Sequence, residues 1–167
     1  PYRRQRQMCI RDSIWADQKI NFRKKVLDMA STVTYHEQTD MENIRKLREV
    51  LKTLPAFAKD YFRAIEPTTS TKTRISYAYD IRIFFQFLLS QNPVLSKTNI
   101  TDINVSVLDQ LQPVDIEEYM EYLKLYDHPD DQTAITNGER GLKRKMSSLR
   151  SFYSYYYKRQ AIQTNPT

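Results

Sequence analysis

The residues whose types and spacing most clearly suggest a chemical function lie near the C-terminus. There, cationic and hydroxyl side chains share one side of a predicted helix. Five apolar side chains recur at spacings of four, three, four and three and therefore share one helical face: Leu142, Met146, Leu149, Tyr153 and Tyr156. The other side carries basic residues and small hydroxyls: Lys143, Ser147, Arg150 and Ser154, with Arg144, Ser148 and Ser151 beside them. Basic groups neutralise phosphates, and small hydroxyl residues let a nucleic-acid backbone come close. The pattern predicts a nucleic-acid surface, with an ordinary solvated basic face as the plainer alternative.

A second segment has the same chemistry. Thr71, Lys72, Thr73 and Arg74 stand where a strongly apolar helix is predicted to begin. A helix N-terminus with hydroxyls and cations favours a phosphate group. Arg140 and Lys145 belong with the cations of the C-terminal helix. Two separate segments of this kind favour DNA binding over a merely solvated surface.

Other groups of reactive residues fit structural roles better. The tyrosines within 153–157 favour packing over catalysis, since no cationic or acid/base partners converge on them in the sequence. His36, His128 and the single cysteine, Cys9, have no zinc-ligand spacing. The acidic residues within 127–131 lack the glycine and glutamate of a calcium loop and indicate a polar turn. We therefore expect no metal and no cofactor.

Composition and charge narrow the class of protein. The 167 residues are 40% hydrophobic, which is adequate for a core, and two glycines disfavour a hairpin-rich β fold. The net charge is +6 and the pI is about 9.3, which is consistent with an anionic partner. Residues 92–137 hold two basic and nine acidic residues, whereas 138–167 hold seven basic and one acidic. One cysteine excludes an intrachain disulfide and fits a reducing, cytoplasmic compartment, and no apolar run is long enough for a membrane span.

Hydrophobic periodicity predicts an all-α domain with helices at 41–54, 56–66, 71–91, 114–126 and 138–160. We expect Asp40 and Asn137 to cap the first and last of these helices. The predicted organisation is a weakly ordered lead-in over 1–38, a helical extension over 39–66 and a DNA-binding domain over 67–167. Residues 1–13 resemble translated sequencing-adapter sequence and are excluded from the functional argument.

Three stretches together resemble the core-binding, SAM-like domain of the tyrosine recombinases, the family of the phage integrases. The residues that carry the resemblance are Thr73 and Tyr77, then Pro113, Asp115, Ile116 and Tyr119, then Lys145, Ser147, Ser148, Leu149, Arg150, Phe152, Tyr153, Asn165 and Pro166. The match covers residues 68–167, and the helices from Asp40 onwards resemble an extension of the same domain. With Tyr77 added, the predicted DNA-contacting residues are Thr71, Lys72, Thr73, Arg74, Tyr77, Arg140, Lys143, Arg144, Lys145, Ser147, Ser148 and Arg150.

The resemblance implies a SAM-like bundle of four to five helices that forms half of a C-shaped clamp on double-stranded DNA. Its first and third helices would lie against the major groove, and these are the two helices that the charge pattern indicates. The family's catalytic residues belong to a C-terminal domain that this chain is expected to lack. The fragment would then be no enzyme, and the full-length protein of a bacterium, phage or mobile element would be a DNA-bound tetramer that cuts and rejoins DNA through a tyrosyl phosphodiester.

Two other functions remain open from the sequence. A stand-alone helical regulator would need a short turn before its basic helix, and the long acidic connection at 92–137 disfavours it. A helical protein-interaction module would use its tyrosines to dock a partner and would be indifferent to salt.

Overall fold

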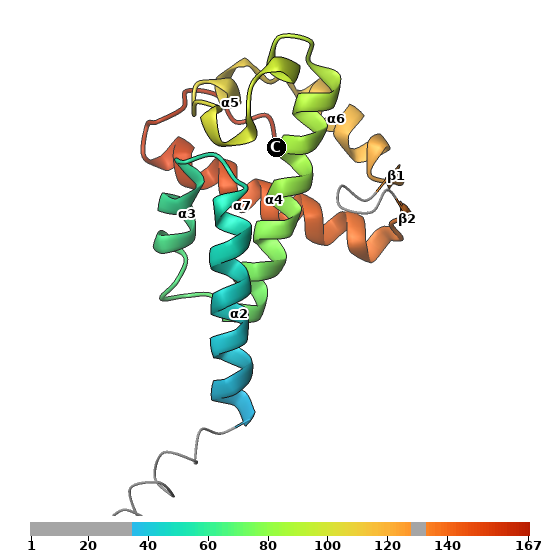
Figure 1. The fold of residues 1–167 in the computed structure, drawn as a ribbon. Coiled ribbons are helices and arrows are strands. Elements are labelled where there is room, and N and C mark those ends of the chain that lie inside the picture. The colour runs from blue at the N-terminus through green and yellow to red at the C-terminus, as the bar shows by residue number, and fades with distance from the viewer. Residues whose placement is uncertain (1–34, 128–132) are drawn as a thin grey trace, which may run out of the picture. The chain divides into compact units, whose positions relative to one another are not determined.

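The computed structural model describes residues 35–127 and 133–167 (Figure 1). The chain divides into two compact units, Pro1–Thr39 and Asp40–Thr167. Helix α2 (Tyr35–Lys52) begins in the first unit, and all other described elements belong to the second. Most of the predicted lead-in, the adapter-like residues 1–13, His128 and two aspartates of the expected acidic turn, Asp130 and Asp131, lie outside the described residues.

The prediction of a mostly helical fold is confirmed. The elements after α2 are α3 (Ala58–Ala64), α4 (Thr71–Gln91), η1 (Leu95–Lys97), η2 (Ile100–Asp102), α5 (Val107–Gln110), α6 (Pro113–Tyr122), β1 (Leu125–Asp127), β2 (Ala134–Thr136) and α7 (Glu139–Lys158). Helix α4 has both predicted bounds, and Ser70 caps it by accepting a hydrogen bond from the backbone N–H of Thr73 at 3.3 Å. No helix among the described residues is long and apolar enough to cross a membrane.

The two predicted caps are wrong. Helix α2 begins at Tyr35, so Asp40 lies inside the helix rather than before it. Gly138 is the N-cap of α7 and makes no side-chain capping bond. The side-chain amide of Asn137 is used elsewhere, because it donates to the Leu123 carbonyl at 2.7 Å and so ties the entry of α7 to the end of α6.

The region between α6 and α7 also differs from the prediction. Helix α6 ends at Tyr122 instead of 126, and the chain then forms a two-stranded antiparallel hairpin in which Tyr126 pairs with Ile135. Tyr126 is buried, so the alternation of one buried residue between two exposed ones overrides the helical period at this point. The two ends of the expected polar turn therefore lie in paired strands, and β2 directly precedes the entry of α7.

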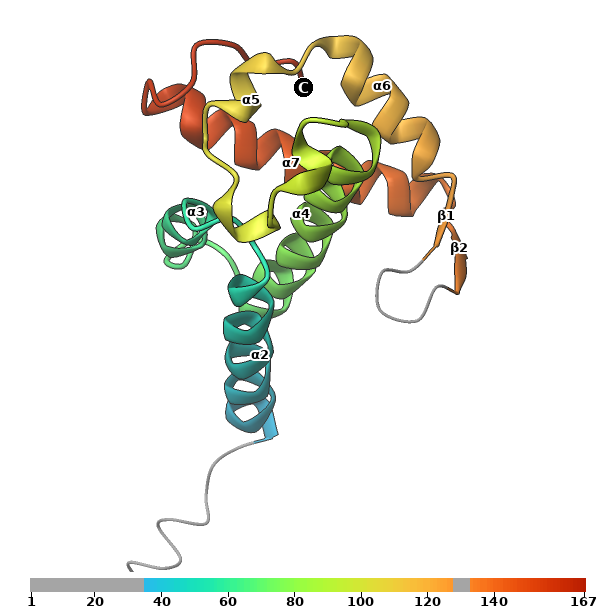
Figure 2. The ribbon, with the colours of Figure 1, turned by 45° about the horizontal axis from the view of Figure 1, so that its top comes forward.

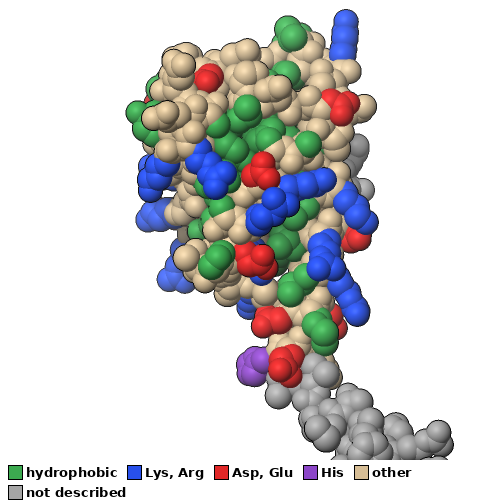
Figure 3. Space-filling view, turned by 90° about the vertical axis from the view of Figure 1, so that its left-hand side faces the viewer, with side chains coloured by type: hydrophobic (Ala, Val, Ile, Leu, Met, Phe, Trp, Pro, Cys, Tyr) green, Lys and Arg blue, Asp and Glu red, His purple; other side chains and the backbone are tan. Residues whose placement is uncertain are grey.

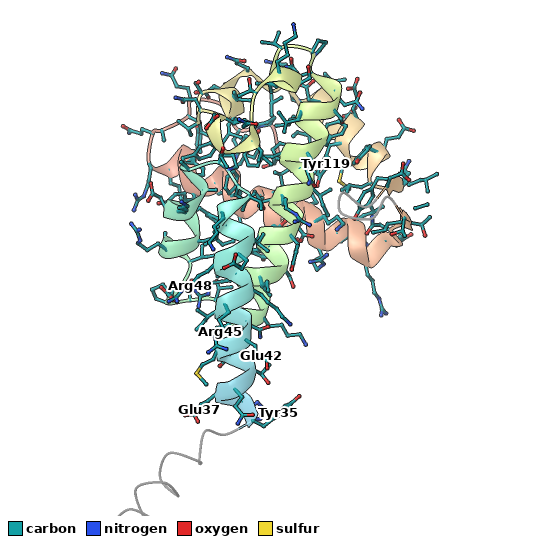
Figure 4. All side chains as sticks on the ribbon, in the orientation of Figure 1. Tyr35, Glu37, Glu42, Arg45, Arg48 and Tyr119 are labelled. Carbon is teal, nitrogen blue, oxygen red and sulfur yellow. The ribbon has the colours of Figure 1, made fainter. Side chains whose placement is uncertain are left out.

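Helix α4 is the centre of the core of the second unit, with α7 packed across it. Figures 1 and 2 both show α7 crossing α4. Phe84 and Phe85 of α4 are buried against Tyr153 and Phe152 of α7, with ring centroids 6.3 and 6.1 Å apart. Tyr119 of α6 lies beside α4 (Figure 4), 5.1 Å from the Phe84 ring. Because α7 packs through its apolar face, its opposite face is turned to solvent.

Candidate nucleic-acid interface

The solvent-facing side of α7 is a row of cations and one small hydroxyl. The exposed members of the predicted set are Arg140, Lys143, Arg144, Ser147 and Arg150. Lys143 is 80% exposed, and its only ion pair among described residues is a loose one of 3.6 Å to Glu139. An exposed pair of this kind contributes little and leaves the ammonium free to meet another anion. The prediction that α7 presents a basic side is confirmed for these five residues.

A buried carboxylate on α4 anchors this row to the core. Asp80 is 1% exposed, and its two oxygens accept from different residues of α7. Its Oδ2 lies 2.9 Å from the Arg144 Nη1, and its Oδ1 lies 3.2 Å from the Lys145 Nζ. Burial raises the pKa of the Asp80 carboxyl, and the two neighbouring cations oppose that rise. The three residues fix the first half of α7 at one register on α4.

Two predicted contact residues of α7 are buried, so the expectation that they face outward is wrong. Lys145 is 5% exposed, with its ammonium on Asp80 and 6.0 Å from the Tyr126 ring. Ser148 is 1% exposed and donates its hydroxyl to the Lys145 carbonyl at 2.8 Å. Both are on the inner side because the ion-pair contact with α4 turns that edge of the helix inward.

At the start of α4, the predicted contact residues are likewise partly exposed and partly buried. Lys72 is exposed, whereas Thr71 donates its hydroxyl to Asp40 of α2 and Thr73 takes part in the cap. Tyr77 is half-buried and packs against the core. The expectation that Arg74 faces outward is wrong, because its side chain is 7% exposed and pairs with Glu66, which follows α3, at 2.9 Å. The structure thus leaves Lys72 and the edge of Thr73 accessible and removes Arg74 from the surface.

A separate groove lies between α2 and α3, beside Arg74. Its floor is apolar and its rim is mainly basic: Ile44, Leu47, Arg48, Leu51, Lys52, Lys59, Phe62, Arg63, Glu66 and Arg74. In Figure 4, Arg45 and Arg48 project from α2. On the face shown in Figure 3, Lys and Arg side chains flank apolar groups, with acidic groups among them. This face is mixed in charge, unlike the outer side of α7.

The tyrosines of α7 lie mainly in the core, as the packing interpretation expected. Burial raises the pKa of Tyr153 and of Tyr156 well above the ordinary value for a phenol, and the Tyr156 hydroxyl donates to the Phe57 carbonyl at 2.8 Å. Burial also raises the pKa of Tyr61 to about 12, and its hydroxyl donates to Ser151 Oγ at 2.9 Å. A phenol that resists ionisation is a poor nucleophile. The described residues include no group of three or more acidic, histidine or cysteine side chains that could hold a metal.

Sequence reasoning missed Asp80, the residue that positions the site. A signal was present, because Asp80 is the one carboxylate in the otherwise apolar and basic stretch 71–91. A buried acid requires a paired cation. The sequence could not say which of the many lysines and arginines would supply it, since the partner lies 64 residues further along the chain.

Comparison with known proteins finds relatives among the tyrosine recombinases. The chain is 30% identical over 128 aligned residues to tyrosine recombinase XerC of Caldanaerobacter subterraneus, in a match that covers 71% of this chain and 34% of that protein. Tyrosine recombinase XerS of Lactococcus lactis is 28% identical over 119 residues, covering 69% of this chain and 32% of the relative. The chain is related to the tyrosine recombinases. The relationship to tyrosine recombinases that the motifs indicate is thereby confirmed.

This recombinase-related chain spans about a third of the length of the curated relatives it matches. No family model matches it, and no solved structure matches it.

Proposed function

We propose that this chain is the DNA-binding, core-binding part of a site-specific tyrosine recombinase, in which residues 67–167 grip the recombination site during integration or excision. The observation that carries the proposal is the exposed basic side of α7, held against α4 by Asp80. In the full-length protein a C-terminal catalytic domain would cut and rejoin the DNA through a tyrosyl phosphodiester, and four copies would assemble on DNA.

The predicted residues take different roles in this proposal. Those that would contact DNA are Lys72, Thr73, Arg140, Lys143, Arg144, Ser147 and Arg150. Arg74, Lys145 and Ser148 would act from within by holding the two helices in place, and Tyr77 and Thr71 would support the start of α4. Burial sets apart Arg74, Lys145 and Ser148, since a side chain less than a tenth exposed cannot reach a phosphate. Thr71 and Tyr77 are partly exposed, and their supporting role follows from the Thr71 hydrogen bond to Asp40 and from the packing of Tyr77 against the core.

The chemistry of the surface favours DNA over a protein partner. Each phosphate neutralised by a lysine or arginine releases counterions, so the logarithm of the affinity falls with the logarithm of the salt concentration by about 0.9 for each neutralised phosphate. A small hydroxyl, Ser147, lies between Lys143 and Arg150 along the helix. The DNA backbone could approach α7 closely at Ser147, whereas a continuous row of long side chains would prevent this.

The test is a binding titration on duplex DNA at two salt concentrations, with single alanine variants of the chain. Arg144→Ala and Arg150→Ala should weaken binding, and the salt slope should fall by about one unit for each phosphate that a variant leaves without its cation. Glu117→Ala and Glu118→Ala are the matched controls, because both glutamates are exposed on α6 and lie in the acidic block. They should leave the affinity unchanged.

Equal affinity for the parent chain and both arginine variants at low salt would exclude this face. A chain that binds no duplex at low salt would favour the interaction-module alternative. The regulator alternative loses its structural basis, because a β hairpin rather than a short turn precedes α7.

A second expectation concerns catalysis. The chain alone should neither relax supercoiled plasmid nor form a covalent adduct with it, because Tyr153 and Tyr156 are buried and hard to ionise. The measurement is denaturing electrophoresis after incubation with plasmid. A denaturant-resistant adduct that disappears in Tyr155→Phe, Tyr156→Phe or Tyr157→Phe would contradict it.

A further inference from the structure

We infer that Arg144 is a specificity-determining residue that reads a base edge, positioned for this by Asp80, while the other exposed cations of α7 contact phosphates. This inference rests on the proposed function and assigns a distinct task to one member of the basic side.

The first observation is a difference in restraint among the cations. Arg144 is 47% exposed and donates from Nη1 to the Oδ2 of a carboxylate that is itself 1% exposed, so one end of its guanidinium is fixed to α4. Arg140 and Arg150 form no ion pair with any described residue. Lys143 has only the loose pair to Glu139. Arg144 is therefore the one exposed cation of α7 that is held in a single orientation in the described structure.

The second observation is that short side chains lie beside Arg144 towards the C-terminal end of α7. On a helix, the neighbours of a residue are three and four positions away. For Arg144 these are Arg140 and Gly141 towards the N-terminal end, and Ser147 and Ser148, both with short side chains, towards the C-terminal end. Ser148 is also buried. The free edge of the guanidinium can thus meet another molecule at close range.

The chemistry of a fixed guanidinium suits base reading. An arginine has five N–H donors in a rigid fork, and a donor pair can bind the O6 and N7 of guanine together. Asp80 takes only one of these donors, by way of Nη1. Because the side chain is already ordered, less conformational entropy is lost on binding. A phosphate contact needs no such order, and the freely exposed Lys143 and Arg150 suit that role.

The experiment is enrichment of a random-sequence duplex pool by the full 167-residue chain, followed by sequencing. The parent chain should enrich guanine at one position by roughly 5- to 150-fold. Arg144→Lys keeps the charge but loses the fork, and it should abolish that preference with less than about a threefold loss of affinity for random duplex. Arg150→Lys is the matched comparison on the same helix and should leave the base preference in place.

The role of Asp80 is tested with the double variant Asp80→Asn, Lys145→Met, which removes both buried charges together. It should lose the guanine preference although Arg144 is still present, with circular dichroism showing an intact fold. If this variant fails to fold, Arg144→Lys alone decides the inference. An unchanged base preference in Arg144→Lys, or a parent chain that binds DNA without any preference, would overturn the inference but not the proposed function. A parent chain that binds no duplex would overturn both.

Discussion

The two halves of α7 are held in place by different kinds of interaction. Its first half meets α4 through a buried carboxylate with two cations, Asp80 with Arg144 and Lys145. Its second half is held by an aromatic cluster, in which the Phe152 ring lies 5.1 Å from Tyr61 and 5.0 Å from Tyr156. One half is fixed by directional charge interactions, and the other by area buried from water.

This difference separates stability from function along one helix. Aromatic packing is strong and tolerant of small shifts, so the second half supplies most of the attachment energy. Ion pairs in a buried setting add little net stability but fix orientation. Three exposed cations, Arg140, Lys143 and Arg144, lie in the half whose orientation is fixed.

Phe152→Ala should have the largest effect on folding. Phe152 is fully buried, and its removal should lower the free energy of unfolding by about 3–5 kcal/mol. Chemical denaturation followed by circular dichroism measures this. Tyr157→Ala is the control on the same half of α7, since Tyr157 is 50% exposed and should cost less than about 0.5 kcal/mol. A similar loss in the free energy of unfolding for the two variants would show that the aromatic cluster does not supply most of the stability.

Asp80→Asn should destabilise the fold by about 3 kcal/mol, because it leaves the buried Lys145 ammonium without its anion. Adding Lys145→Met should restore most of that stability, because it removes the buried ammonium that has lost its anion. The same denaturation experiment measures both. If the double variant is no more stable than Asp80→Asn, the ion pair contributes stability as well as orientation, and the contrast between the halves fails.

The segment that follows α7 supplies the smallest and most local effect. The Asp109 carboxylate accepts from the backbone N–H of Thr164 at 3.0 Å and of Gln163 at 2.7 Å, and the Thr164 bond in particular holds the pKa of Asp109 below its ordinary value. A lowered folded-state pKa gives stability that is present above the unfolded pKa of about 3.9 and is lost as the pH falls through the folded value.

Amide hydrogen exchange at Gln163 and Thr164 should therefore accelerate, relative to the chemical rate, as the pH falls from about 6 to about 2. In Asp109→Asn this pH-dependent component should be missing. Amides of α4, which are far in sequence from this contact, provide the reference. Identical protection of Gln163 in both proteins across the range would show that the carboxylate does not hold this segment.

Local sequence signals located most of the helices, although not all of their ends. The apolar period predicted α4 over 71–91 as observed, and five of the predicted contact residues of α7 are exposed: Arg140, Lys143, Arg144, Ser147 and Arg150. These features depend on residues within a few turns of each other, so a pattern along the chain carries the information. The related recombinases confirm the family that the motifs indicated.

Tertiary structure alone decided which cations face the solvent. Arg74, Lys145 and Arg144 are alike in the sequence, yet the first two are buried and the third is half-exposed. The exposure of these three side chains depends on Glu66 and Asp80, and on a β hairpin that replaces the end of a predicted helix. A salt bridge between residues 64 positions apart forms only when two helices cross at one angle and register. That geometry comes from the packing of the whole core, because no local period along the chain encodes it.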